Sequence, residues 1–385
     1  MYITDDIRYI GVNDRKIDLF EGQYPVKNGM AYNSYVILDE KIAVFDTVDR
    51  HFSEEWLDNL SRALEGRTPD YLIVQHMEPD HSANIALFAE KYPSATLVAS
   101  VQAFAMMKQY FGDDFASRRI VAADGATLPL GRHTLTFFTA PMVHWPEVIV
   151  TFDAASGTLF SADAFGKFGA TDTDEPWDDE ARRYYIGIVG KFGLQVQKLL
   201  SRLSGLEIQT ICPLHGPVLK ENLARYVRLY DLWSSYTPEE EGVLVAYTSV
   251  YGNTEKAALY LADALRQKGV KTQVYDLARS DIFGAVAAAF RFDKTVLATT
   301  TYNGGVFPFM YDFLHHLTER NFQKRTVAIV ENGFWAPSAA KTIRKILEQS
   351  KDLSFVEPTV TLRSSFKEEN REQIDRLAET LSARL

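Results

Sequence analysis

The run YLIVQHMEPDHS, residues 71–82, decides how the first half of this chain is interpreted. Its apolar start, residues 71–74, has the composition of a short buried strand, and a helical stretch is expected near Ser82. Between them stand four potential metal ligands: His76, Glu78, Asp80 and His81. Each alone is more often structural, because turns hold acids and a helix N-terminus favours them. Together they predict a metal-binding loop.

Three further potential ligands follow other strand-like runs. His144 follows TLTFFTAPMV (134–143), Asp163 follows TLFSA (158–162) and His215 follows IQTICPL (208–214). Binding groups of layered α/β proteins gather on loops at strand ends, so we expect these residues to meet the 76–81 loop. Four histidines and three carboxylates suffice for two metal ions, and this donor mixture suits iron or manganese. The alternative is a set of hydrogen-bonded polar core residues.

The remaining four histidines have no such setting. They are interpreted as surface or core residues: His51, His133, His315 and His316.

Composition limits the classes of function. The 385 residues, 46% of them hydrophobic, suffice for two cores. A net charge of −10 opposes binding to nucleic acid or to an anionic membrane. The lone Cys212 excludes an internal disulfide and a Cys-x-x-Cys iron site, so electrons must come from another molecule. The acidic start MYITDDIRYIGV and the lack of a long apolar run predict a cytoplasmic protein.

The pattern changes along the chain. Up to about residue 236 it is strand-rich, whereas from Gly242 apolar runs such as GVLVAYTS and KTVLATTT alternate with helix-period segments, as in βαβ units. The segment YTPEEEG (236–242) is expected to be an exposed hinge. We therefore expect domains at 1–238 and 239–385.

Three loops of the second half follow apolar runs: TSVYGNT (248–254), TTTYNGG (299–305) and ENGFWAPSA (331–339). The first offers hydroxyl groups and a helix N-terminus, which favour a bound phosphate, although such a turn alone is often only a turn. Loops at the carboxyl ends of a parallel sheet form its ligand crevice. The candidate cofactor-binding residues are Thr248, Ser249, Val250, Tyr251, Gly252, Asn253, Thr254, Thr301, Tyr302, Asn303, Gly304, Gly305, Asn332, Gly333, Phe334 and Trp335.

Both halves resemble known proteins. The second resembles flavodoxin, which implies strand order 2-1-3-4-5 and bound FMN. Tyr302 and Trp335 offer flat aromatic surfaces on which a flavin ring can stack, and the alternative is that they are core residues. The 76–81 run is similar to the metallo-β-lactamase signature His-x-His-x-Asp-His, with Glu78 in place of the second histidine, a mark of the flavodiiron proteins. The likeness extends to five further segments: IGVNDRKIDLFEGQYPV (10–26), AYNSYVI (31–37), APMVHWPE (140–147), LFSADAFG (159–166) and ARRYYIGI (181–188).

This resemblance implies an α/β chain in which a metallo-β-lactamase-like αββα sandwich precedes a flavodoxin-like doubly wound parallel sheet. It also implies two irons, one held by His76, Glu78 and His144 and the other by Asp80, His81 and His215. Asp163 bridges them.

The implied activity is reduction of dioxygen to water, or of nitric oxide to nitrous oxide, with electrons relayed by FMN. CPLHGPVL and DAFGKFG resemble the versions found in strict anaerobes and favour dioxygen. The resemblance further implies an external donor, such as a rubredoxin or a reduced cofactor. The implied assembly is a head-to-tail homodimer, or a dimer of dimers, in which each flavin lies against the irons of the other chain.

Two other functions are consistent with parts of the pattern. A zinc-dependent hydrolase joined to a flavodoxin-like module is possible because the parent fold contains many hydrolases, but Glu78 argues against it. The other is an electron carrier with a flavin and no metal, which the seven candidate ligands argue against. The metal content distinguishes all three.

Overall fold

The computed structural model describes residues 2–383, and the chain divides into two compact units, Met1–Asp231 and Leu232–Leu385. The predicted domain boundary, after residue 238, lies just beyond this division. Each unit has its own sheets and its own core.

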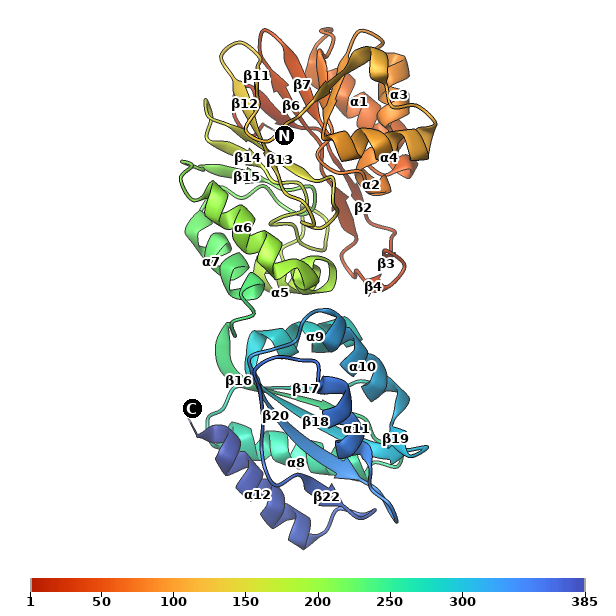
Figure 1. The fold of residues 1–385 in the computed structure, drawn as a ribbon, viewed down its shortest axis with the longest axis vertical. Coiled ribbons are helices and arrows are strands. Elements are labelled where there is room, and N and C mark those ends of the chain that lie inside the picture. Colours follow the sequence, from red (N-terminus) through yellow and green to blue (C-terminus); the bar gives the residue numbers. More distant parts are fainter. Residues whose placement is uncertain (1, 384–385) are drawn as a thin grey trace. The chain divides into compact units, whose positions relative to one another are not determined.

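The first unit contains two main sheets (Figure 1). The six-stranded sheet has the order β1 (Ile7–Tyr9), β6 (Tyr35–Leu38), β7 (Ile42–Phe45), β8 (Tyr71–Ile73), β9 (Thr96–Ala99), β10 (Arg119–Val121). The five-stranded sheet has the order β11 (Thr127–Pro129), β12 (Thr134–Thr139), β13 (Ile149–Asp153), β14 (Thr158–Phe160), β15 (Thr210–Cys212). Two small ribbons pair β2 (Val12–Asp14) with β5 (Met30–Tyr32), and β3 (Leu19–Phe20) with β4 (Tyr24–Pro25).

Apolar side chains of the two sheets form the core of this unit. The sequences YVIL of β6 and IAVF of β7 are almost completely buried, and the Phe45 ring of β7 stacks on the Phe160 ring of β14 with centroids 3.9 Å apart. Helices lie outside the sheets: α1 (Ser53–Leu64), α2 (Pro79–Ser82), α3 (Ile85–Lys91), α4 (Val101–Phe111), α5 (Trp177–Tyr184), α6 (Gly193–Leu203) and α7 (Leu223–Ser234). The expected αββα sandwich is confirmed.

The second unit is built on a parallel sheet. Its strands are β16 (Glu240–Tyr247), β17 (Thr272–Asp276), β18 (Phe292–Tyr302), β20 (Arg325–Asn332), β21 (Leu353–Phe355) and β22 (Val360–Leu362), with β19 (Gly305–Val306) paired antiparallel to β18. The order β17-β16-β18-β20 followed by β21 and β22 confirms the expected 2-1-3-4-5 order, with the fifth strand divided into two short pieces.

Helices cover both faces of this sheet (Figure 1). α8 (Asn253–Gln267) and α12 (Glu368–Ser382) share a core with β16, β18 and β20. The other helices are α9 (Ile282–Arg291), α10 (Pro308–Glu319) and α11 (Ala339–Leu347). This arrangement confirms the expected doubly wound fold.

The segment expected to be a hinge is partly regular structure. Its last residues, 240–242, begin β16, where the Glu240 carboxylate accepts hydrogen bonds from Lys271 and Arg291 and is thereby held in the strand. Only residues 235–239 connect α7 to β16. Among the helices within residues 2–383, none combines the length and apolar character needed to cross a bilayer.

Candidate metal centre and cofactor pocket

The loop after β8 carries four of the expected ligands, and buried hydrogen bonds fix its path. The Asp46 carboxylate accepts from the backbone N–H groups of Gln75 (2.7 Å) and His76 (3.2 Å). Pro79 begins α2, which carries Asp80 and His81, and the His81 carbonyl accepts from Thr47 N–H at 2.8 Å. The ligand side chains therefore project from a rigid turn.

The other three expected ligands come from the second sheet. His144 lies in the connection between β12 and β13, Asp163 in the turn after β14, and His215 after β15. Because β14 and β15 are parallel neighbours, their carboxyl ends carry Asp163 and His215 to the same edge. A hydrogen bond of 2.8 Å from Leu214 N–H to the Ala162 carbonyl joins the two turns.

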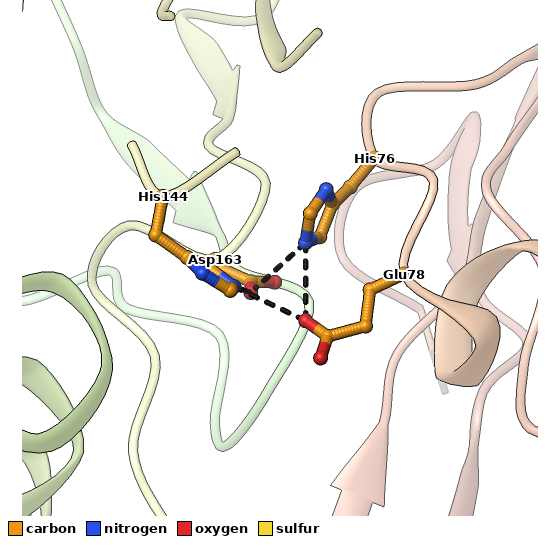
Figure 2. Close-up of side chains that lie close together, drawn as sticks. All are labelled: His76, Glu78, His144 and Asp163. Carbon is orange, nitrogen blue, oxygen red and sulfur yellow. Dashed lines mark hydrogen bonds and ion pairs between the residues drawn. The ribbon is translucent and has the colours of Figure 1, made fainter. Parts of the chain in front are cut away.

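Four side chains form a first group (Figure 2). Glu78 Oε2 lies 3.2 Å from His76 Nε2 and 3.1 Å from His144 Nε2. Asp163 Oδ2 lies 3.1 Å from His144 Nε2 and 3.6 Å from His76 Nε2. Two imidazole nitrogens and two carboxylate oxygens thus converge on one position.

Three side chains form a second group beside the first. His81 Nε2 lies 3.0 Å from His215 Nε2, and Asp80 Oδ2 lies 3.4 Å from each. The other oxygen of Asp163, Oδ1, lies 3.4 Å from His81 Nε2 and 3.9 Å from His215 Nε2. Asp163 therefore presents one oxygen to each group.

These distances fit metal ions. Ligand atoms about 2.0–2.2 Å from a metal stand about 3.3–3.6 Å apart in a tetrahedral site and about 2.8–3.1 Å apart in an octahedral one. Within the described part of the chain, Asp163 Oδ1 and both oxygens of Asp80 are buried and have no hydrogen-bond partner. Buried acceptors left unsatisfied cost about 1–3 kcal/mol each, and bound cations would satisfy them.

The electrostatics also favour bound cations. Burial alone would raise the pKa of Asp163, but His76, His144 and His81 hold it well below its usual range. Burial raises the pKa of Asp80 to about 7, because removing it from water disfavours its charge. Burial and the neighbouring His81 lower the pKa of His215 to about 4, so its ring is neutral at pH 7 and can act as a ligand.

Two residues that contact the ligand loop were not expected. Glu147 accepts a hydrogen bond of 2.8 Å from His76 Nδ1, and Asp46 holds the loop as described above. Glu147 is the last residue of APMVHWPE (140–147). The sequence pattern that could have indicated it is an acidic residue three positions after the expected ligand His144.

The other four histidines lie outside both groups. His133 is buried between the carboxylates of Asp6 and Asp153, as expected of a core residue. The side chains of His51 and His315 are exposed, and His316 contacts the ring of Phe283.

A pocket of about 590 Å³ opens in the second unit at the carboxyl ends of β16, β18 and β20. It is lined by residues of all three expected loops: Ser249, Val250, Tyr251, Asn253, Thr254, Thr301, Tyr302, Asn303, Gly304, Asn332, Gly333, Phe334 and Trp335. The N-terminus of α8 begins at this pocket after Gly252, whose φ of +82° favours glycine. Hydroxyl groups and a helix N-terminus suit a phosphate, and the aromatic side chains suit a flat ring.

The pocket differs from expectation at a few positions. Thr248, Gly252 and Gly305 do not line it, and the Thr248 hydroxyl is instead hydrogen-bonded to Thr299 (2.7 Å) between the strands. Thr300, Ala336 and Ser364 line it in addition. Ser364 follows β22 and is joined to the Asn332 side chain by two hydrogen bonds. The sequence pattern that could have indicated Ser364 is the short apolar run VTL (360–362) that precedes it.

Each of the two units matches the model of a known protein family. The model of the ODP family beta lactamase matches residues 30–216, and that of the flavodoxin domain matches residues 244–376. A nitric oxide reductase of Moorella thermoacetica is 29% identical over 100% of this chain and 98% of its own length.

Solved structures agree over nearly the whole chain. The flavodiiron protein of Giardia intestinalis has a TM-score of 0.91 and 26% identity, covering 99% of this chain and 95% of that one. The rubredoxin oxygen:oxidoreductase of Desulfovibrio gigas shares the fold, with a TM-score of 0.90 at 24% identity and coverage of 99% and 97%. With its β-lactamase-like unit, its flavodoxin unit and their order along the chain, this protein belongs to the flavodiiron family.

Proposed function

We propose that this protein is an oxidoreductase that passes electrons from FMN to two irons and there reduces dioxygen to water, with nitric oxide as a second substrate. The observation that carries the proposal is the position of Asp163, with one carboxylate oxygen directed at each of two ligand groups. One shared carboxylate holds two metal ions close enough to act on one substrate.

When bound, the two irons would supply redox equivalents and open coordination positions, and the flavin would supply electrons one or two at a time. In the first unit His76, Glu78 and His144 would hold one iron and Asp80, His81 and His215 the other. Glu78 provides an oxygen donor where a zinc enzyme of the parent fold has a histidine. With Asp163 shared, each iron would have two imidazole and two oxygen donors, a mixture that favours iron.

Tyr184 would donate a hydrogen bond to the substrate. Its hydroxyl is buried and has no hydrogen-bond partner among the described residues, and its ring lies 5.5 Å from that of His215. Burial and the carboxylates of Asp163 and Glu78 raise the pKa of Tyr184 well above its usual range, so the hydroxyl keeps its proton at pH 7. A phenol held in this way can donate a hydrogen bond to an oxygen atom formed beside it.

In the second unit Ser249 and Thr254 would bind the flavin phosphate at the start of α8. Asn332 Nδ2 donates to Thr254 Oγ1 at 3.3 Å, which holds this hydroxyl at the pocket. Tyr302 and Trp335 would lie against the flavin ring, and both are exposed, by 45% and 86%.

We further propose that a second copy of the chain completes the active assembly, with an external protein or reduced cofactor as electron donor. Tyr251, Phe334 and Trp335 expose 92%, 73% and 86% of their surface beside the pocket. Large exposed aromatic side chains around a redox cofactor are typical of a surface that another chain covers.

The test is anaerobic reduction of the purified protein, followed by exposure to each gas in turn. We expect two irons and one FMN per chain, with faster turnover of dioxygen than of nitric oxide. Two zincs per chain with hydrolysis of an ester or lactam would instead support the hydrolase, and faster nitric oxide turnover would overturn the proposed gas preference.

A further inference from the structure

The ligand histidines differ in what their second ring nitrogen contacts. His76 Nδ1 donates to the Glu147 carboxylate at 2.8 Å, whereas His215 Nδ1 donates to the neutral Ala31 carbonyl at 2.7 Å. His81 Nδ1 is buried and has no hydrogen-bond partner among residues 2–383. Only one of these three rings therefore has an anionic partner.

Glu147 is firmly held in that position. Its side chain is fully buried, and its Oε1 also accepts a hydrogen bond of 2.8 Å from the Met77 N–H. The Ser100 hydroxyl donates to the Glu147 carbonyl at 2.8 Å and fixes the backbone. A carboxylate at Nδ1 keeps a proton there, so Nε2, which lies beside Glu78 and Asp163, is the nitrogen that would bind a cation.

The contact makes the two halves of the centre unequal. The first group has the carboxylate of Glu78, the second has that of Asp80, and Asp163 faces both. Glu147 adds a negative charge next to a ligand ring of the first group alone. The other nearby carboxylate, Asp46, bonds to backbone N–H groups and to the Gln75 amide rather than to a ligand ring.

We propose that Glu147 is a positioning residue that fixes the tautomer of His76 and makes the His76–Glu78–His144 position the tighter metal site of the two. This inference rests on the proposed two-metal centre. Hydrogen bonding to a carboxylate raises the basicity of an imidazole ligand and its affinity for a cation.

The test uses Zn²⁺ competition between metal-free protein and a chromophoric chelator, which resolves two binding steps. Glu147→Gln keeps an acceptor oxygen of similar size and removes the charge. We expect about 10–100-fold weaker binding in the tighter step. The weaker step is expected to stay unchanged.

Asp153→Asn is the matched control. Asp153 Oδ2 accepts from His133 Nδ1 at the same 2.8 Å and both side chains are buried, but neither belongs to a ligand group. Its loss is expected to leave both Zn²⁺ affinities unchanged. Equal weakening of both steps in Glu147→Gln, or of neither, would overturn the proposal.

A second measurement does not depend on the variant folding. In zinc-loaded protein with ¹⁵N-labelled histidine, we expect the His76 ring to carry its proton on Nδ1, with a strongly downfield resonance that persists in Asp153→Asn. A His76 Nδ1–H resonance no further downfield than that of His81, whose Nδ1 has no hydrogen-bond partner among the described residues, would overturn the assigned contact with Glu147. Unaltered protein that binds fewer than two Zn²⁺ would count against the two-metal centre itself, which is a different failure.

Discussion

Replacing Asp163 with alanine would remove the carboxylate that we propose as a ligand of both metal positions. Its oxygens lie 3.1 and 3.6 Å from the Nε2 atoms of His144 and His76, and 3.4 and 3.9 Å from those of His81 and His215. No other described side chain faces both groups in this way. We therefore expect Asp163→Ala to lose most of its iron and all gas reduction.

The magnitude follows from this double role. Loss of a residue that only supports a ligand costs about 10–100-fold in affinity, so loss of the ligand itself is set at about 100-fold for each position, or ~2.7 kcal/mol. At free iron about tenfold above the wild-type Kd, occupancy falls from about nine-tenths to about one-tenth. Flavin content is expected to stay at one per chain, because the flavin pocket lies in the other unit.

The assay is metal analysis of desalted protein together with the flavin absorbance. Asp153→Ala serves as a control, because it also removes a buried aspartate bonded to a histidine, yet one outside the ligand groups. If Asp163→Ala retains two irons per chain, the bridging assignment is wrong. If both variants lose iron equally, the loss reflects general destabilisation.

Three other predictions concern the flavin, the assembly and the response to pH. Ser249→Asp or Thr254→Asp is expected to empty the flavin site, because the new carboxylate repels the flavin phosphate, while iron stays bound. One FMN per chain in either variant would mean that the phosphate binds elsewhere. One variant would lack iron (His81→Ala with Asp163→Ala) and another would lack flavin (Thr254→Asp). Mixing the two is expected to restore gas reduction through subunit exchange. A mixture without activity would contradict electron transfer between chains. Burial alone would raise the pKa of Asp153, but hydrogen bonds from His133 and Ser156 lower that pKa below the ordinary 3.8. The contribution of ionised Asp153 to folding stability is therefore present above pH 4 and is lost as the pH falls through the lowered pKa. The difference in unfolding free energy between wild type and Asp153→Asn in urea should therefore shrink as the pH falls below 4, and a difference independent of pH would refute the assignment.

The sequence predicted those features that have a local pattern. The ligand loop was recognisable because β8 and α2 place four donor side chains within six residues. The βαβ alternation of the second unit indicated a parallel sheet, and the resemblance to flavodoxin implied its strand order, which the structure confirms. Asp163 and His215 were expected to meet this loop because each stands at the end of an apolar run, and the structure brings both next to His81.

Features made by distant contacts were not predicted. Glu147 is 71 residues from its partner His76, so nothing near either residue indicates the hydrogen bond. Thr248 was expected in the pocket because of its hydroxyl, but its side chain faces Thr299 on the neighbouring strand. Ser364 enters the pocket only because the fifth strand is divided and its second piece, β22, pairs with the end of β20.

The second ligand group joins parts of the chain that are far apart in sequence. His81 comes after β8 of the first sheet and His215 after β15 of the second, and 134 residues separate them. A metal ion held by both acts as a reversible cross-link, and closing a loop of this length lowers the entropy of the unfolded chain by an amount worth about 5 kcal/mol at 25 °C in the chain-entropy treatment of disulfides. Loading with metal is therefore expected to raise the melting temperature of this unit, in which the two sheets share one core, and chelation is expected to lower it.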